Sequence, residues 1–341
     1  MQSVLSFLNR HALFLAIVVG AVGFPVFRHW TPALPPLIFM MLFFTFCKVN
    51  PLDLRLHKWH GLALVAQVLL GVGSYALLVA LIPYFPAMQD RVVAESVMLC
   101  FIMPTATAAP IIAGKLGGSI QNLTMYTLVS NFATVLIVPL LFPYIHPMAD
   151  FSFFMASRLI LRKVGTLLVG PFAAAWLLRI GYDLIQRQRG SEKRFELSRR
   201  WAQLPFYLWS CTIVILMGDI TYTLLYDSYR AWTAVGICIG AAVACLIQFV
   251  IGRSLGWHFP ASSHGKDYQD VVINPATAPK TPSGISRVTA GQALGQKNTT
   301  LAIWMAQVYL SPLTALGPAV YMIVQNLFNA YQLRVAAARG R

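Results

Sequence analysis

Residues 104–110 read PTATAAP and residues 291–300 read GQALGQKNTT, and each stretch interrupts an otherwise apolar run. A proline removes a backbone N–H donor, and its ring clashes with the preceding helical turn. A helix that contains both Pro104 and Pro110 should therefore be kinked or broken between them. In the second stretch, glycines and a polar run take the place of proline. We expect two discontinuous helices.

The two stretches also carry polar side chains that could bind a solute or its coupling ion. The candidate binding residues there are Thr105, Thr107, Gln296, Lys297, Asn298 and Thr300. The residues expected to shape the interruptions are Pro104, Pro110, Gly291 and Gly295. Thr127 and Asn131 follow on the next apolar run, four residues apart and therefore on one helical face. Broken helices in a transporter free backbone groups and half-helix dipoles that can hold a solute.

The composition is that of a membrane protein. Hydrophobic residues make up 57% of the chain and charged residues 11%, whereas an ordinary soluble domain has about 25% charged residues. The apolar runs approach the ~20 residues that a helix needs to cross the hydrocarbon, and they are too long for the strands of a barrel. Ten runs are predicted to be membrane-spanning helices: 12–28, 33–49, 60–84, 93–115, 119–145, 155–182, 203–226, 231–256, 286–310 and 312–334.

Lysine and arginine are distributed unevenly over the connections between these runs. The termini and the connections after the second, fourth, sixth and eighth runs hold most of them, and the densest group is Arg179, Arg187, Arg189, Lys193, Arg194, Arg199 and Arg200. Cytoplasmic loops are enriched in Lys and Arg, so both termini are predicted to be cytoplasmic, in the plasma (cell inner) membrane. The net charge of +15 reflects this topology. Because no basic domain with interleaved aromatics is present, no nucleic-acid partner is expected.

The two interrupted runs are the fourth and the ninth, which occupy the same place if the chain divides into two sets of five. Residues 1–150 and 151–341 would then form two repeats. An odd number of spans in each repeat places the two in opposite orientations, so the repeat would be inverted. The segment 258–284 is rich in Ser, Thr, Pro and Lys and is predicted to be a cytoplasmic insertion.

These segments resemble the bile acid:sodium symporter family, whose fold has ten helices, a panel domain, a core domain and discontinuous crossing helices four and nine. The family's fourth helix has a Pro followed by small residues and Thr-Ala-Ser-Asn, where this chain has Pro104, Thr107 and Ala108. Its fifth helix ends in Pro-Leu-Leu, as at 139–141 here. Its ninth helix reads Glu-x-Gly-x-Gln-Asn, and residues 293–298 read ALGQKN.

Further family features are the Gly-Arg-x-x-Gly at 252–256 and Gln67 in the third run. The resemblance implies an all-α polytopic membrane protein that carries a small organic anion by alternating access.

The departures from the family pattern concern the sodium sites. In the family, the Glu of helix nine is shared by two sodium ions, and the Ser-Asn of helix four and the Gln of helix nine complete the two sites. Here these positions are Ala293, Ala109-Pro110 and Lys297. Sodium requires oxygen ligands and a fixed ammonium would repel it, so sodium coupling is predicted to be weakened or lost. Thr127, Asn131 and Gln67 remain as candidate ligands.

Lys297 has three roles open to it. An ionised Lys at the bilayer centre costs from about 2.5 to 17 kcal/mol, so it persists only where it faces a cavity or a partner. It could be a fixed counter-charge for a carboxylate substrate, or a proton carrier that couples transport. It could also form a salt bridge that holds the two broken helices together, with Asp219 as a candidate partner.

Other function classes have weaker support in the sequence. No HExxH or paired DxxxD motif indicates an intramembrane enzyme, and no catalytic residue, metal site or resident cofactor is expected. A proton-coupled or uniporting carrier of the same fold and a non-transporting membrane sensor remain as alternatives. The predicted partners are a small organic anion and the membrane lipid, with sodium or a proton as the coupling ion.

Overall fold

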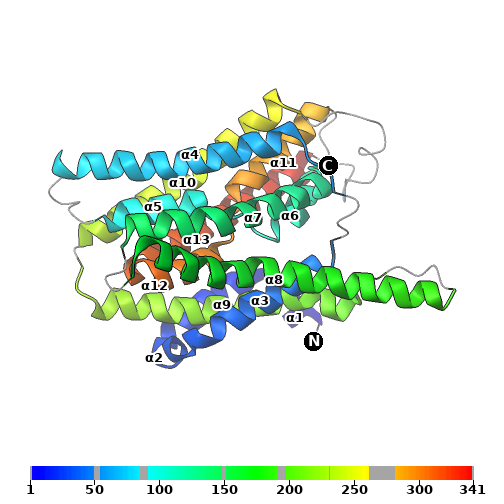
Figure 1. Cartoon of the computed structure of the whole chain (residues 1–341), viewed down its shortest axis with the longest axis horizontal. Coiled ribbons are helices and arrows are strands. Elements are labelled where there is room, and N and C mark those ends of the chain that lie inside the picture. The colour runs from blue at the N-terminus through cyan, green and yellow to red at the C-terminus, as the bar shows by residue number, and fades with distance from the viewer. Residues whose placement is uncertain are drawn as a thin grey trace. The chain divides into compact units, whose positions relative to one another are not determined.

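The structure is a computed structural model that describes residues 2–49, 54–84, 91–147, 151–190, 195, 197–229, 231–260 and 281–339. All the longer elements of regular secondary structure in these ranges are helices (Figure 1). Six helical segments there are long and apolar enough to cross a membrane: Phe24–Phe46, Lys58–Tyr84, Ile120–Ile145, Phe153–Gln188, Gln203–Tyr226 and Ala231–His258. The architecture is that of an all-α polytopic membrane protein.

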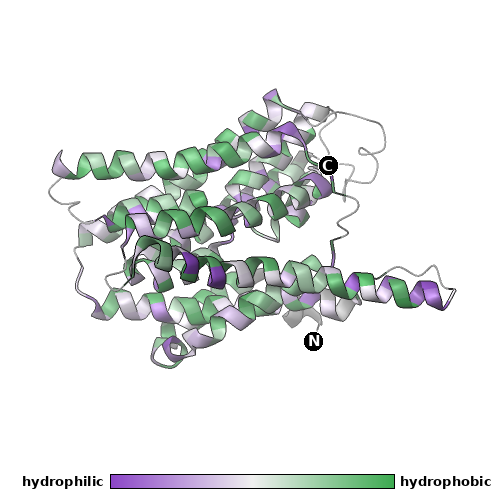
Figure 2. Cartoon of the chain, in the orientation of Figure 1, coloured by the Kyte–Doolittle hydropathy of each residue, from purple (hydrophilic) through white to green (hydrophobic). Residues whose placement is uncertain are grey.

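Apolar side chains cover the outer faces of these helices. Figure 2 shows hydrophobic colour along most of the length of the long helices, with hydrophilic residues gathered mainly towards helix ends. Leu69, Leu136 and Val250 are 66%, 63% and 66% exposed. Soluble proteins rarely expose large apolar patches, whereas lipid covers such faces in a membrane protein.

The chain divides into two compact units, and the first contains residues Met1–Pro51 and Pro147–Ser228. Its helices are α1 (Gln2–Val22), α2 (Phe24–Phe27), α3 (Leu34–Phe46), α8 (Phe153–Gln188) and α9 (Arg199–Tyr226). Helix α3 packs against both α8 and α9, and α1 packs against α9. A Cβ atom at Gly20 of α1 would collide with the backbone of Val214 on α9, so a small residue is needed where these two helices meet.

The second unit contains residues Leu52–His146 and Tyr229–Arg341. Its helices are α4 (Lys58–Leu81), α5 (Val92–Ile102), α6 (Ala109–Lys115), α7 (Ile120–Ile145), α10 (Ala231–His258), α11 (Pro282–Gly295), α12 (Thr299–Tyr309) and α13 (Leu316–Arg339). Helix α10 packs against α11, α5 and α13. Gly252 and Gly256 stand one turn apart on α10, and a Cβ at either would collide with the α11 backbone. This Gly-x-x-x-Gly spacing lets the two helix backbones approach closely.

Helices or pairs of helices overlap the ten expected runs, but six helical segments of the described chain qualify as candidate membrane spans, so ten spans stay a prediction. The fourth run is divided into α5 and α6, and the ninth into α11 and α12. Both compact units combine segments from both halves of the sequence. The expected repeats, 1–150 and 151–341, are a different kind of division, which stays a prediction. Within the expected insertion 258–284, residues 261–280 lie outside the described residues.

Candidate functional site

The first interruption lies between α5 and α6 and is set by its two prolines. Met103, which precedes Pro104, has φ −58° and ψ 146°, an extended conformation that a following proline favours. Helix α5 therefore ends at Ile102. Pro110 occupies the second position of α6, where its missing N–H costs no helical hydrogen bond. The first proline thus ends one half-helix, and the second is placed at the start of the other.

The second interruption, between α11 and α12, is set by its polar residues. Gln296 is extended, with φ −100° and ψ 109°. Asn298 caps α12, because its Oδ1 accepts a hydrogen bond of 3.2 Å from the backbone N–H of Leu301. Gly291 lies inside α11 and Gly295 is its last residue, and a Cβ at either would meet a side chain of α10. Gly291 therefore serves helix packing and does not interrupt the helix, whereas Gly295 stands at the break and also packs against α10.

The two interrupted segments pair with each other in the second unit. Thr105 and Lys297 form an isolated antiparallel β-bridge. The Ala106 N–H donates to the Gln296 carbonyl at 2.9 Å, and the Asn298 N–H donates to the Pro104 carbonyl at 2.8 Å. Backbone groups that the helix breaks leave free are thereby satisfied, as a water-free environment requires.

Thr105 is buried, and both its backbone N–H and its hydroxyl donate hydrogen bonds within the chain. Its hydroxyl donates to the Ala293 carbonyl at 2.7 Å, and its backbone N–H donates to the hydroxyl of Ser130 at 3.1 Å. Thr105 therefore ties α11 and α7 to the first interruption. In this arrangement it is a structural residue more than a binding residue.

Lys297 is buried, with 1% of its surface exposed. Its backbone N–H donates to Gln325 Oε1 on α13 at 2.9 Å, and Gln325 Nε2 donates back to the Lys297 carbonyl at 3.3 Å. Within the described residues, its Nζ atom has neither a hydrogen-bond partner nor an ion pair. The backbone of Lys297 is fixed by these bonds, whereas its buried side-chain nitrogen has no partner within the described residues.

Asp219, the acid considered as a partner for this lysine, lies on α9 in the other compact unit. The salt-bridge role for Lys297 has no support among the described ion pairs.

Thr127 and Asn131 lie on one face of α7, as their spacing predicts, and both are buried. Asn131 Nδ2 donates to the Thr127 carbonyl at 2.6 Å, and the Thr127 hydroxyl donates to the Leu123 carbonyl at 2.9 Å. Asn131 Oδ1 and Asn298 Nδ2 are buried without a partner among the described residues. Buried polar atoms are normally paired, so these atoms mark places where a ligand or water is expected.

Gln67 of α4 forms hydrogen bonds with the carboxyl-terminal end of α5. Its Nε2 donates to the carbonyls of Ile102 and Met103 at 2.7 and 3.3 Å, and its Oε1 accepts from Tyr126 at 3.1 Å. These carbonyls stand at the point where α5 stops. Gln67 therefore donates to backbone carbonyls at the interruption, and its expected role as an ion ligand stays a prediction.

The remaining expected residues surround the same place. Gln296 is buried and its Nε2 donates to Gln292 Oε1. Thr300 is buried in the first turn of α12, and Thr107 is partly exposed in the turn before α6.

Gln248 was not predicted from the sequence. This residue of α10 donates to the Cys100 carbonyl at 3.1 Å and to the Tyr321 hydroxyl at 2.9 Å. Tyr321 in turn donates to the carbonyl of Gly295. Gln248 Oε1 is buried without a partner among the described residues. A lone glutamine in a long apolar run was the available signal.

No family model and no curated protein matches the chain. Among the described residues, no group of three His, Cys, Asp or Glu could hold a metal ion. Function must therefore be inferred from the site itself. The site combines the buried side-chain nitrogen of Lys297 with the unpartnered amide donor of Asn298, both at the second helix break.

Proposed function

We propose that the chain is a secondary transporter that moves a small organic anion of the carboxylate type by alternating access. The observation that carries this proposal is the buried side-chain nitrogen of Lys297, which has no partner among the described residues. A charge in this position is costly unless something compensates it. A carboxylate substrate would supply the missing counter-charge.

The surroundings of Lys297 favour an anion. Helix α12 begins two residues after Lys297, and the amino-terminal end of a helix carries partial positive charge. Asn298 Nδ2 is a further donor without a partner in the described chain. Transporters built from discontinuous helices use such half-helix ends to hold anionic groups near the middle of the membrane.

The coupling ion follows from the same residues. Ala293 and Lys297 stand where the bile acid:sodium symporter family, which the chain resembles, has sodium ligands. A fixed ammonium group repels sodium, so we propose that sodium coupling is weakened or lost. Two alternatives keep the same fold: a proton-coupled or uniporting carrier in which Lys297 exchanges a proton, and a membrane sensor that binds without transport.

The proposal predicts that Lys297→Gln abolishes uptake. Purified protein in liposomes would be tested with a panel of radiolabelled small carboxylates, with pH and sodium varied separately. If Lys297 is the counter-charge, uptake by Lys297→Gln should be lost at every pH, by at least about tenfold, because a charge-assisted hydrogen bond is removed. Lys58→Gln is the matched control, since Lys58 is exposed at the start of α4.

Other outcomes separate the alternatives. If only the pH dependence of uptake disappears in Lys297→Gln, the lysine is the proton carrier. Specific binding without flux identifies a sensor. Full uptake by Lys297→Gln, equal to that of Lys58→Gln, would contradict any role of the ammonium group in transport.

A further inference from the structure

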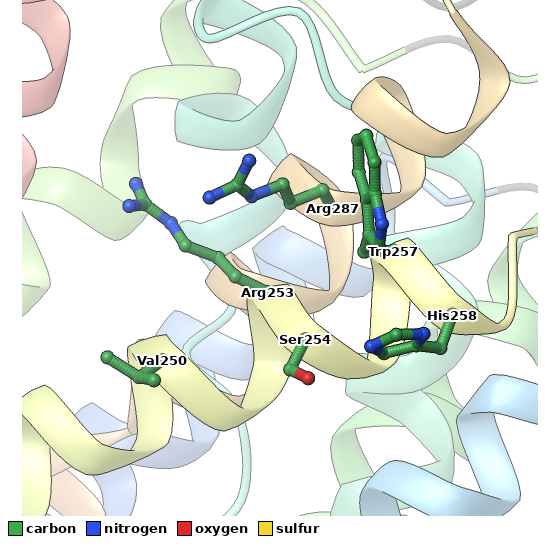
Figure 3. Close-up of a pocket in the computed structure, with 6 residues that line it drawn as sticks. All are labelled: Val250, Arg253, Ser254, Trp257, His258 and Arg287. Atoms are coloured by element: carbon green, nitrogen blue, oxygen red, sulfur yellow. The ribbon is translucent and has the colours of Figure 1, made fainter.

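A basic pocket lies in the second unit, at the end of α10. It has a volume of about 300 Å³ and is lined by Val250, Arg253, Ser254, Trp257, His258 and Arg287. Figure 3 shows that five of these residues come from the last turns of α10 and that Arg287 comes from the adjacent α11. The pocket is thus formed by two helices that meet near one end of a candidate membrane span, Ala231–His258.

The two arginines give this pocket its charge. Their guanidinium groups extend towards the same side of α10 (Figure 3). No lining residue is acidic. The ion pair seen between Glu95 and His146 involves neither arginine, and no carboxylate lines the pocket to balance Arg253 and Arg287. Two like charges that face one space repel each other unless an anion lies between them.

Aromatic rings hold both guanidinium groups in place. The Arg287 guanidinium lies over the Trp257 ring, 5.7 Å from its centroid, and that of Arg253 lies over the Phe328 ring at 5.5 Å. Stacking on a ring fixes the plane of an arginine while leaving N–H donors free for a ligand. The pocket is therefore preorganised for an acceptor with several oxygens.

The chemistry of the lining matches a phosphate group. Guanidinium groups bind phosphate through paired N–H donors, and Ser254 and His258 offer further polar atoms at the rim. Trp257 lies near the end of the span, where tryptophans of membrane proteins contact the lipid head groups. Basic pockets between membrane helices bind anionic lipid head groups, particularly on the cytoplasmic side, where the charge distribution predicts this end to lie.

We propose that this pocket binds a phosphate group, carried either by an anionic phospholipid or by a soluble phosphate. The two sources share the same charge and oxygen acceptors, and the experiment below separates them. This pocket is distinct from the site around Lys297, and its occupancy does not depend on the chain being a transporter.

Hydrogen bonds connect the pocket to the helix interruption. Arg253 Nη2 donates to Gln332 Oε1 at 2.8 Å, and the same oxygen accepts from Gln292 Nε2 at 3.1 Å. Gln292 Oε1 accepts from Gln296, the residue before Lys297. Arg253 is thus linked through Gln332 and Gln292 to the interruption, whereas Arg287 lies over the Trp257 ring. Arg287 is exposed and is the better residue to change.

The proposal is tested by ligand binding to the full chain in detergent. The probes are short-chain phosphatidylglycerol, inorganic phosphate and, as a neutral lipid, phosphatidylcholine with the same acyl chains, measured by calorimetry. We expect Arg287→Gln to raise the Kd of the bound anion by at least about tenfold, because charge-assisted hydrogen bonds are lost. Arg287→Lys should lose less, since it keeps the charge. Arg334→Gln is the matched control, as Arg334 is exposed on α13 and does not line the pocket.

The outcomes are distinct. Binding of phosphatidylglycerol but not of inorganic phosphate, with the loss confined to Arg287→Gln, supports the proposal with a lipid as the source. Binding of inorganic phosphate with the same dependence supports it with a soluble source. The proposal is overturned if neither anion binds wild type more tightly than phosphatidylcholine does, or if Arg334→Gln weakens binding as much as Arg287→Gln. Unchanged thermal unfolding of Arg287→Gln shows that the variant is folded.

Discussion

Thr105 and Lys297 face each other in the bridge between the two interruptions, yet they differ in what they leave for a ligand. Thr105 uses both its N–H and its hydroxyl within the chain. Lys297 forms hydrogen bonds only through its backbone N–H and carbonyl, and its Nζ has no partner among the described residues. At the scale of single residues, the threonine side chain therefore bonds within the chain, while the lysine side chain opposite has no partner among the described residues.

This difference predicts the effect of Thr105→Val. The Ala293 carbonyl would lose its donor in a buried place, so the free energy of unfolding should fall by about 1–3 kcal/mol. Thr105→Ser, which keeps the hydroxyl, should lose less. Thermal unfolding in detergent measures both variants. A Thr105→Val protein with wild-type stability and weakened substrate binding would show instead that Thr105 is a ligand.

The sequence predicted some of the residues of this site for clear physical reasons. Prolines at 104 and 110 must disturb a helix, and a lysine inside an apolar run must meet a cavity or a partner. The roles of Gln67 and Ser130 could not be predicted, because they depend on which carbonyl or N–H lies opposite in space. One sequence contains no information about such pairs.

At the scale of helices, α10 and α11 are held together by close backbone contact. Gly256 faces the carbonyl of Ser286, and Gly252 faces that of Ala290. The sequence indicated glycines in α11 as helix breakers, but in membrane helices glycine often permits packing. Gly291 illustrates this: it lies inside α11, and a Cβ there would meet the side chain of Arg253. The helix ends later, at the polar residues that cap the next one.

We expect Gly256→Ala to destabilise the second unit. The added methyl group would collide with the α11 backbone, which cannot move away as a flexible side chain could, at a cost of about 1–3 kcal/mol. Gly73→Ala is the matched control, because a Cβ there meets nothing within 4 Å and α4 is a regular helix. That variant should be neutral or slightly stabilised. Equal losses in both variants, measured by thermal unfolding, would rule out backbone contact as the cause.

At the scale of the whole molecule, the apolar composition predicted the class of protein and the positions of its helices. It did not predict that each compact unit would combine segments from both halves of the chain, since contacts between distant segments leave no mark in one sequence. The apolar pattern also underestimated the length of α8. This helix continues to Gln188, because Arg and Gln are good helix formers beyond the apolar run.

The predicted orientation can be tested with reporter fusions in a bacterial host. Alkaline phosphatase fused after residue 190, beside the densest group of basic residues, should be inactive because that connection is predicted to be cytoplasmic. The same enzyme fused after residue 227, beyond α9, should be active. A cytoplasmic fluorescent reporter at the same points provides the matched control with the opposite pattern. Activity in the reverse order would place both termini outside.

The bridge at Thr105 and Lys297 also limits how the second unit can change shape. Separating the two interrupted segments would leave the amides of Ala106 and Asn298, and the carbonyls that they bind, without hydrogen-bond partners in a medium without water. Each stranded group costs several kcal/mol, so separation is far less favourable than joint displacement. If Lys297 binds a solute as proposed, both half-helix pairs are expected to move with that solute as one body.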